Sequence, residues 1–161
     1  MTTDLFEKLC TAIKKSVDSN CRKPVTVSFS GGVDSALVAL LAKDFTDVEL
    51  VAVGTPGSHD LTAAKSAAEM MGMELRCVEV SAEDMASEAI IMKKEIDLEQ
   101  IEVEFMLPFW IAAKEAKHSI LMCGQGADEL FGGYARFRNK KNMPNLSKEV
   151  KDLCERIPNR E

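Results

Sequence analysis

The sequence predicts an α/β fold, in which a doubly wound, mainly parallel sheet carries helices on both faces. Two observations predict it. Four short apolar runs, typical of buried parallel strands, alternate along the chain with longer segments of helical character. The first and last of these runs lead directly into glycine-rich turns, at 30–35 and 124–134. In an open parallel sheet, ligands bind at the carboxyl ends of strands, where such turns lie.

The strands are expected at 25–30, 49–54, 74–80 and 119–123. The segments between them are long enough for right-handed helical crossovers. The expected strand order is 3-2-1-4, which makes the first and fourth strands neighbours. The two glycine-rich turns should then meet at one edge of the sheet.

The helices are predicted from apolar spacing and from capping residues. Residues 1–20 contain an amphipathic helix that packs on the rest of the domain, and 144–158 contain a C-terminal helix. One helix begins near Ser35, and the next runs from Ser58 to just before Gly72, which suits a C-terminal cap.

Two further helices are expected before the last strand. One begins after Ser81, with Asp84 completing a capping-box-like pair, and Pro108 should open the other over 109–117. Between these two helices, the acidic stretch 95–104 is interpreted as a solvated face that could instead rim a pocket.

Length and composition fit one soluble globular domain that is long enough to form a hydrophobic core. The 161 residues are 46% hydrophobic and 29% charged, with no apolar run long enough to cross a bilayer and no secretory signal. The net charge of −6 argues against a nucleic-acid partner, and the basic residues between 136 and 141 are interpreted as solvated surface. Five separated cysteines without a C-x-x-C pair indicate reduced thiols, hence a cytoplasmic protein without zinc.

The turn Ser30–Ser35, which reads SGGVDS, is typical of a phosphate-binding loop. Its two glycines let the backbone approach a ligand, and the helix that follows presents free N–H groups to phosphate oxygens. The hydroxyls of Ser30 and Ser35 add donors. Asp34 repels phosphate, so its place here indicates a bridging metal ion. The loop lacks the lysine and spacing of the usual nucleoside-triphosphatase motif.

The turn 124–134, which reads GQGADELFGGY, follows the fourth strand as the first loop follows the first strand. It carries Asp128. Two carboxylates, Asp34 and Asp128, beside one triphosphate would form a magnesium site, because Mg²⁺ prefers a few carboxylates with phosphate oxygens and water. These residues therefore predict a ligand with a phosphate tail, bound together with Mg²⁺.

These segments carry a family resemblance. SGGVDS resembles the pyrophosphate loop of the N-type ATP pyrophosphatases, a superfamily with an adenine nucleotide alpha hydrolase-like fold. GQGADELFGGY and the segment VAVGTPGSHD at 51–60 are similar to the synthetase domain of asparagine synthetase. The resemblance implies that the chain activates the side-chain carboxylate of aspartate, or of a similar acid, as an acyl-adenylate. Ammonia would then displace AMP.

The resemblance also implies roles for individual positions. Asp34 and Asp128 match the magnesium ligands, and Ser30–Ser35 would hold the pyrophosphate. The full set that we expect to bind ATP or pyrophosphate comprises Phe29, Ser30, Gly31, Gly32, Asp34, Ser35, Val53, Gly54, Cys123, Gly124 and Gly126. Of these, the backbone of Phe29, Val53, Cys123 and Gly124 would frame the adenosine.

Two departures from the family bear on catalysis. The glutaminase domain of full-length members, with its N-terminal cysteine, has no counterpart here, since residue 2 is Thr2 and about two dozen residues precede the first strand. The family's catalytic lysine and C-terminal substrate segment match no position in this chain. Glu99, Glu102 and Glu104 fall near the family's substrate-side acidic groups.

Three functions stay open at this point. The first is an ATP-dependent, amide-forming ligase, with ammonia or a glutaminase partner as nitrogen source and with a second synthetase segment or a homodimer as further partners. The second is a nucleotide-binding module or partial subunit without turnover. The third is sulfur transfer to tRNA through Cys123, which the acidic charge disfavours.

Overall fold

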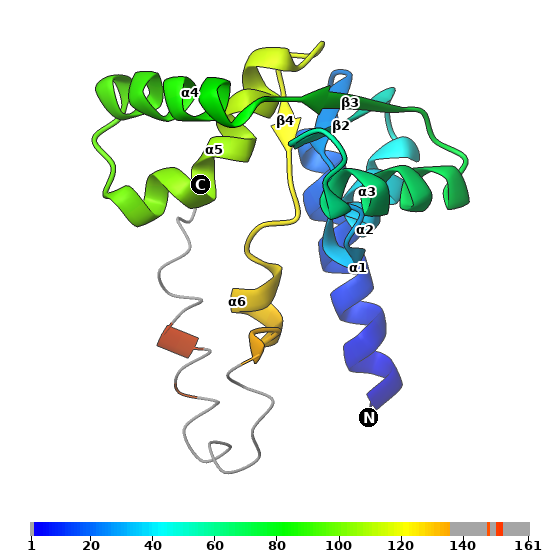
Figure 1. Ribbon diagram of the computed structural model, residues 1–161. Helices are drawn as coiled ribbons and strands as arrows, with labels where there is room; N and C mark the ends of the chain where they lie inside the picture. The colour runs from blue at the N-terminus through cyan, green and yellow to red at the C-terminus, as the bar shows by residue number, and fades with distance from the viewer. Residues whose placement is uncertain (1, 136–147, 149–150, 153–161) are drawn as a thin grey trace. The chain divides into compact units, whose positions relative to one another are not determined.

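The computed structural model describes residues 2–135, 148 and 151–152 (Figure 1). They fall into two units, one ending at Cys123 and the other beginning at Gly124, and each is described by itself. The predicted C-terminal helix at 144–158 lies outside the described residues except for Lys148, Lys151 and Asp152, which are helical. The basic residues 136–141 also lie outside the described part. That the chain forms one domain over 1–161 stays a prediction.

A four-stranded parallel sheet forms the centre of the first unit (Figure 1). Its strands are β1 (Val25–Ser28), β2 (Val48–Gly54), β3 (Leu75–Glu79) and β4 (Leu121–Met122). Their order is β3-β2-β1-β4, so the predicted order 3-2-1-4 is confirmed. All three pairings are parallel.

Strand β4 is shorter than the predicted 119–123. Only two pairs join it to β1, Thr26 with Leu121 and Val27 with Met122. Since it is an edge strand, β1 is its one neighbour in the described sheet. Backbone pairing alone therefore holds β4 weakly.

The helices of the first unit are α1 (Thr2–Asn20), α2 (Val33–Lys43), α3 (His59–Met70), α4 (Ala82–Glu95) and α5 (Gln100–Glu115), and α6 (Ala127–Phe131) lies in the second unit. Helices α1 to α4 begin close to the predicted positions. The Ser58 hydroxyl accepts a hydrogen bond from the Leu61 N–H at 3.3 Å, and the Ser81 hydroxyl accepts one from the Asp84 N–H at 3.1 Å. Gly72, at φ +60°, follows α3 as a C-terminal glycine should.

The prediction that Pro108 opens a helix is wrong. Helix α5 begins eight residues earlier, at Gln100, and Pro108 lies inside it. Glu99 and Glu102 form a capping box there, and the Glu102 carboxylate accepts from the Glu99 N–H at 2.8 Å. This N-terminal cap and the burial of Val103 and Ile111 outweigh the hydrogen bond that proline cannot donate. Part of the acidic stretch therefore caps a helix.

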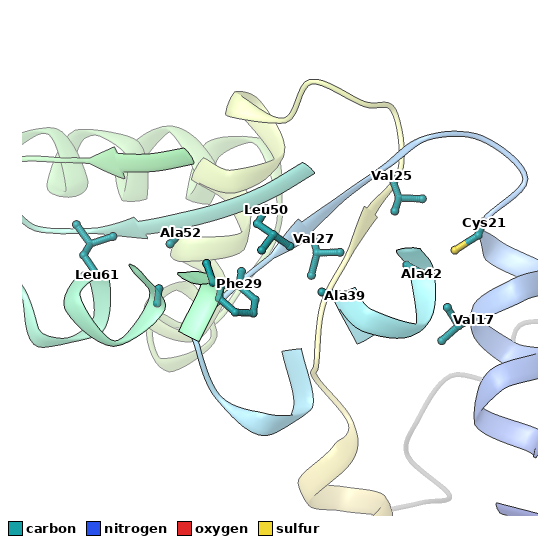
Figure 2. Close-up of a cluster of buried hydrophobic side chains, with 12 residues drawn as sticks. Val17, Cys21, Val25, Val27, Phe29, Ala39, Ala42, Leu50, Ala52 and Leu61 are labelled. Carbon is teal, nitrogen blue, oxygen red and sulfur yellow. The ribbon is translucent and has the colours of Figure 1, made fainter. Parts of the chain in front are cut away.

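Helices cover both faces of the sheet, as predicted. On one face, α1, α2 and α3 contribute side chains to a buried cluster with β1 and β2, which Figure 2 shows around Val27, Phe29 and Leu50. On β2, Leu50 and Ala52 belong to this cluster, whereas the intervening Val51 is buried outside it. Helix α5 packs on β2. Successive buried residues of β2 thus alternate between the two faces of the sheet.

The described cysteines, which are Cys10, Cys21, Cys77 and Cys123, are free. Burial, followed by the negative charge of Asp18, raises the pKa of the Cys21 thiol. A thiol that resists ionisation is a poor nucleophile, so Cys21 is a core residue. Among the described helices, none combines the length and the apolar character needed to cross a membrane.

A polar network lies at the amino edge of the sheet, by which we mean the end where the parallel strands begin. It is centred on the Glu49 carboxylate. One oxygen accepts from the Thr26 hydroxyl at 2.7 Å and from the Lys117 N–H at 2.8 Å. The other accepts from Arg76 Nε at 3.0 Å. Burial raises the pKa of Glu49, but these hydrogen bonds and the Arg76 charge outweigh burial, so the pKa is lowered from its ordinary 4.5.

This lowered pKa predicts a loss of stability on acidification. The contribution of Glu49 is complete above its unfolded-state pKa and disappears as the pH falls through the lower pKa of the folded state. At pH 7, Glu49→Gln should lower the free energy of unfolding by about 1.5–3 kcal/mol, the range for hydrogen bonds to charged groups. Urea unfolding at pH 7 and at pH values below 4.5 should show the two proteins converging in stability. A difference that stays constant would contradict the assignment.

Candidate nucleotide site

The loop after β1 turns sharply at Gly31, which has a φ of +78°. A Cβ atom at this position would lie 2.9 Å from the backbone carbonyl of Ala63 and 2.9 Å from the Cα atom of Ala64. Gly31 is therefore required twice, by its left-handed conformation and by its contact with the backbone of α3. The loop follows β1 and packs closely against α3, and this packing constrains the conformation of the loop at Gly31.

The two serines of the loop bond to the loop itself. The Ser35 hydroxyl donates to the Gly32 carbonyl at 3.0 Å and accepts from the Ser30 N–H at 3.3 Å, while the Ser30 hydroxyl accepts from the Gly32 N–H at 3.3 Å. The two hydroxyl oxygens are 3.2 Å apart. Ser35 is only 4% exposed, so its hydroxyl shapes the loop, whereas Ser30 is exposed.

The amino end of α2 fits a phosphate group. Gly32 is the N-cap residue, and no side chain caps the first turn, because glycine has none to offer and both serines bond elsewhere. The first-turn N–H groups of Val33, Asp34 and Ser35 thus carry no side-chain cap. Uncapped N–H groups at a helix N-terminus, together with the helix dipole, favour an anion.

Asp34 lies in this first turn with its side chain exposed. A carboxylate here is compatible with the helix dipole, yet it would repel a phosphate unless a cation lay between them. The donor chemistry fits Mg²⁺, which binds through one or two carboxylates and phosphate oxygens. Among the described residues, no three acidic, histidine or cysteine side chains gather to hold a metal ion.

The residues expected around the adenosine come from three neighbouring strands. Phe29 is 2% exposed and directly follows β1, and its N–H donates to the Val51 carbonyl at 2.8 Å. Val53 is half-buried near the end of β2, and Cys123 is half-buried after β4. The sheet order therefore brings the chain segments of these three residues to one edge, as predicted.

Gly54 has a packing reason that the sequence did not indicate. A Cβ atom there would lie 2.8 Å from Ser58 Oγ and 2.9 Å from Leu61 Cγ. The Gly54 carbonyl accepts from the Val80 N–H at 3.0 Å. The absence of a side chain at Gly54 thus lets the capped start of α3 pack on β2.

The second glycine loop belongs to the second unit. Gly126, at φ +92°, precedes α6, and Gly132, at φ +65°, ends it. The Asp128 side chain is exposed and lies against Gly133, where a Cβ atom would collide with the carboxylate. The Gly133 N–H also donates to the Asp128 carbonyl at 3.1 Å. The two final glycines thus close the short helix and leave room for Asp128.

Of the predicted residues, Phe29–Ser35, Val53, Gly54 and Cys123 lie in the first unit, whereas Gly124, Gly126 and Asp128 lie in the second. That Asp34 and Asp128 share an ion stays a prediction. Sequence reasoning missed the part of Ala63 and Ala64 in shaping the loop. Small residues on α3 were the available signal, but alanines are too common in helices to point to a neighbouring loop.

Comparison with known proteins gives one family. The model of the family described as asparagine synthase matches residues 7–159. The chain is 38% identical over 153 residues to the "Putative asparagine synthetase (glutamine-hydrolyzing) 1" of Methanocaldococcus jannaschii, covering 89% of this chain and 28% of that protein. It is 32% identical over 146 residues to asparagine synthetase (glutamine-hydrolyzing) 1 of Bacillus subtilis, covering 86% and 23%. The chain thus spans about a quarter of the length of these relatives.

Among solved structures, an NMN synthetase from Francisella tularensis superposes with a TM-score of 0.50 at 16% identity, over 94% of this chain and 74% of that one. At this identity the likeness concerns the fold alone. It agrees with the parallel sheet and its order.

Proposed function

The chain belongs to the asparagine synthase family, and from that membership we propose that it binds Mg-ATP at the loop after β1 and transfers AMP to the side-chain carboxylate of aspartate or of a similar acid. The reaction would release pyrophosphate. Ammonia would then attack the activated carbonyl carbon, so that an amide forms and AMP leaves. AMP is a far better leaving group than a carboxylate oxygen, which is the chemical reason for the adenylation step.

The observation that carries this proposal is the amino end of α2, which has no side-chain cap. It directly follows Gly31, whose close contact with α3 constrains the loop. In the proposed complex, the N–H groups at 33–35 and the Ser30 hydroxyl would bind the β- and γ-phosphates, which leave as pyrophosphate. Asp34, together with Asp128, would hold Mg²⁺ against the phosphate oxygens. The ion would supply charge neutralisation as negative charge develops on the leaving group.

The remaining residues would orient the nucleotide. The backbone at Phe29, Val53, Cys123 and Gly124 would border the adenosine, so that binding energy from this part of ATP aligns the α-phosphate with the acid. Gly54 would support the site by letting the start of α3 pack on β2, and Gly126 by its left-handed conformation before α6. The contribution that we propose for these residues to catalysis is positioning and charge stabilisation.

Partners and location are proposed on the same basis. The two relatives are named as glutamine-hydrolysing. For this chain we propose ammonia as the nitrogen source, either free or delivered by a glutaminase partner chain, with a second synthetase segment or a second copy as further partners. A nucleic-acid partner is not proposed, given the net charge of −6. A chain with reduced cysteines suits the cytoplasm.

Isotope exchange between ATP and labelled pyrophosphate tests the proposal directly. Exchange should require Mg²⁺ and rise when aspartate is added, because only a reversible adenylation returns label to ATP. EDTA should abolish it, and glutamate serves as the acid control that is one methylene longer. Tight ATP binding without exchange under any acid would contradict the ligase proposal and favour a nucleotide-binding module without turnover.

A further inference from the structure

The polar network at the amino edge of the sheet joins elements that are distant in the sequence. Thr26, Glu49 and Arg76 are each the second residue of β1, β2 and β3. Through Lys117 and Glu115 the network also reaches the connection between α5 and β4. The proposed reaction uses none of these side chains. A network of this extent needs a structural or functional reason.

Its contacts converge on the α5–β4 connection. The Lys117 N–H donates to Glu49, and the His118 N–H donates to the Thr26 hydroxyl at 3.3 Å. Arg76 Nη1 donates to the Glu115 carboxylate at 3.1 Å, and its Nη2 donates to the Glu115 carbonyl. Three successive segments of the sheet thus hold one short connection in place.

This connection leads directly into β4, which has fewer paired residues than any other strand of the described sheet. Besides the two paired residues of β4, one bond from the Thr26 N–H to the Ile120 carbonyl, at 2.9 Å, ties the chain to β1. Met122 and Ile120 also pack against the core, with Cys21 Sγ 3.9 Å from Met122 Sδ. Thr26 is fully buried and bonds β4 through its backbone and the connection through its side chain.

From these contacts we propose that Glu49 is a positioning residue for the nucleotide site, acting through the α5–β4 connection. The inference rests on the proposed function in one respect, which is that its effect on the site is measured as affinity for Mg-ATP. By holding 117–118 at the amino edge, Glu49 sets where β4 lies beside β1, and hence where the backbone of Cys123 stands at the carboxyl edge. A strand rises about 3.3 Å per residue, so Glu49 lies several residues away from the proposed ligand and does not touch it.

The charge and geometry of Glu49 suit this role. Its side chain is 15% exposed, and its carboxylate accepts three hydrogen bonds, one from each neighbouring element. Replacement by alanine would leave the Lys117 N–H and the Thr26 hydroxyl without their acceptor. Thr26 is fully buried, and a buried hydroxyl without a partner is costly, so the connection should move. The move would displace β4 while the pairing between β2 and β3 persists.

The test combines nucleotide affinity with hydrogen exchange in the folded protein. In Glu49→Ala, amides at 116–123 should lose protection, and the dissociation constant for Mg-ATP should rise about tenfold, the lower end of the effect of losing a residue that orients direct binding groups. Glu49→Gln, which keeps one acceptor oxygen, should fall between Glu49→Ala and wild type. Thr26→Val should behave like Glu49→Ala, and Thr26→Ser, which retains the hydroxyl, should restore affinity.

Glu74→Gln is the matched control, since this exposed acid precedes β3 at the same edge. It should change neither readout. All measurements are made at a temperature well below the thermal unfolding midpoint of each variant, so that lower global stability cannot mimic a loss of affinity. If Glu49→Ala and Thr26→Val keep wild-type exchange at 116–123 and wild-type affinity, the inference is overturned. If wild type itself binds no nucleotide, the proposed function fails, whereas the exchange data still decide whether Glu49 anchors β4.

Discussion

Asp34→Asn should weaken the binding of ATP in the presence of Mg²⁺ by at least about 100-fold, or about 2.7 kcal/mol. Loss of an outer-sphere partner alone costs metal sites about 10–100-fold, and a direct ligand should cost more. The substitution removes a charge and leaves the fold intact, because the Asp34 side chain is exposed. Isothermal titration with ATP, with and without Mg²⁺, measures the effect.

Asp47→Asn is the control for this experiment. Asp47 is also exposed, but it immediately precedes β2, at the opposite edge of the sheet. The same loss of one negative charge there should leave ATP affinity unchanged. If both variants bind Mg-ATP as wild type does, Asp34 is not a magnesium ligand, and the loop holds phosphate through its N–H groups alone.

Gly31→Ala should lower the free energy of unfolding by about 2–4 kcal/mol and abolish ATP binding. The estimate adds two costs. A Cβ atom at φ +78° is strained, and it would also collide with backbone atoms of Ala63 and Ala64 at 2.9 Å. Backbone cannot rotate away as a side chain can, so either α3 or the loop must shift. Chemical denaturation and ATP titration measure the two effects.

Gly57→Ala separates strain from collision. Gly57 has a φ of +71°, nearly that of Gly31, but a Cβ atom there would meet nothing within 4 Å. Its cost should therefore be the strain alone, about 1–2 kcal/mol. Equal destabilisation by the two substitutions would show that the contact between Gly31 and α3 does not constrain the loop.

Much of the fold is predictable from the sequence because its elements have local signals. Ser58 and Ser81 cap the helices that follow them, and the apolar runs of β1 and β2 mark strands buried on both faces. The strand order 3-2-1-4, which is expected for this type of doubly wound sheet, is the observed order. The prediction misplaces the start of α5, because Pro108 resembles a helix-start signal, whereas the capping box of Glu99 and Glu102 lies upstream.

The candidate site was predictable in its residue types but not in its internal contacts. The motif SGGVDS predicted a loop for anions, and the uncapped α2 agrees with it. The contact of Gly31 with Ala63 depends on tertiary packing between segments about 30 residues apart. The bond from the Ser35 hydroxyl to the Gly32 carbonyl is local, but it depends on the loop shape that this packing imposes. The Glu49 network was missed for the same reason, since Thr26, Arg76 and Lys117 carry no local pattern that relates them.

The proposed function depends most on Asp34 and Asp128, which we propose would hold one Mg²⁺ ion against the phosphates of ATP. A double-mutant cycle on Mg²⁺-dependent ATP affinity tests it, using wild type, Asp34→Asn, Asp128→Asn and the double variant. If both carboxylates bind the same ion, each single variant should lose most of the Mg²⁺ dependence, and the double variant should be little worse than either. Losses that add in full, or an Asp128→Asn variant that binds Mg-ATP as tightly as wild type, would contradict a shared ion.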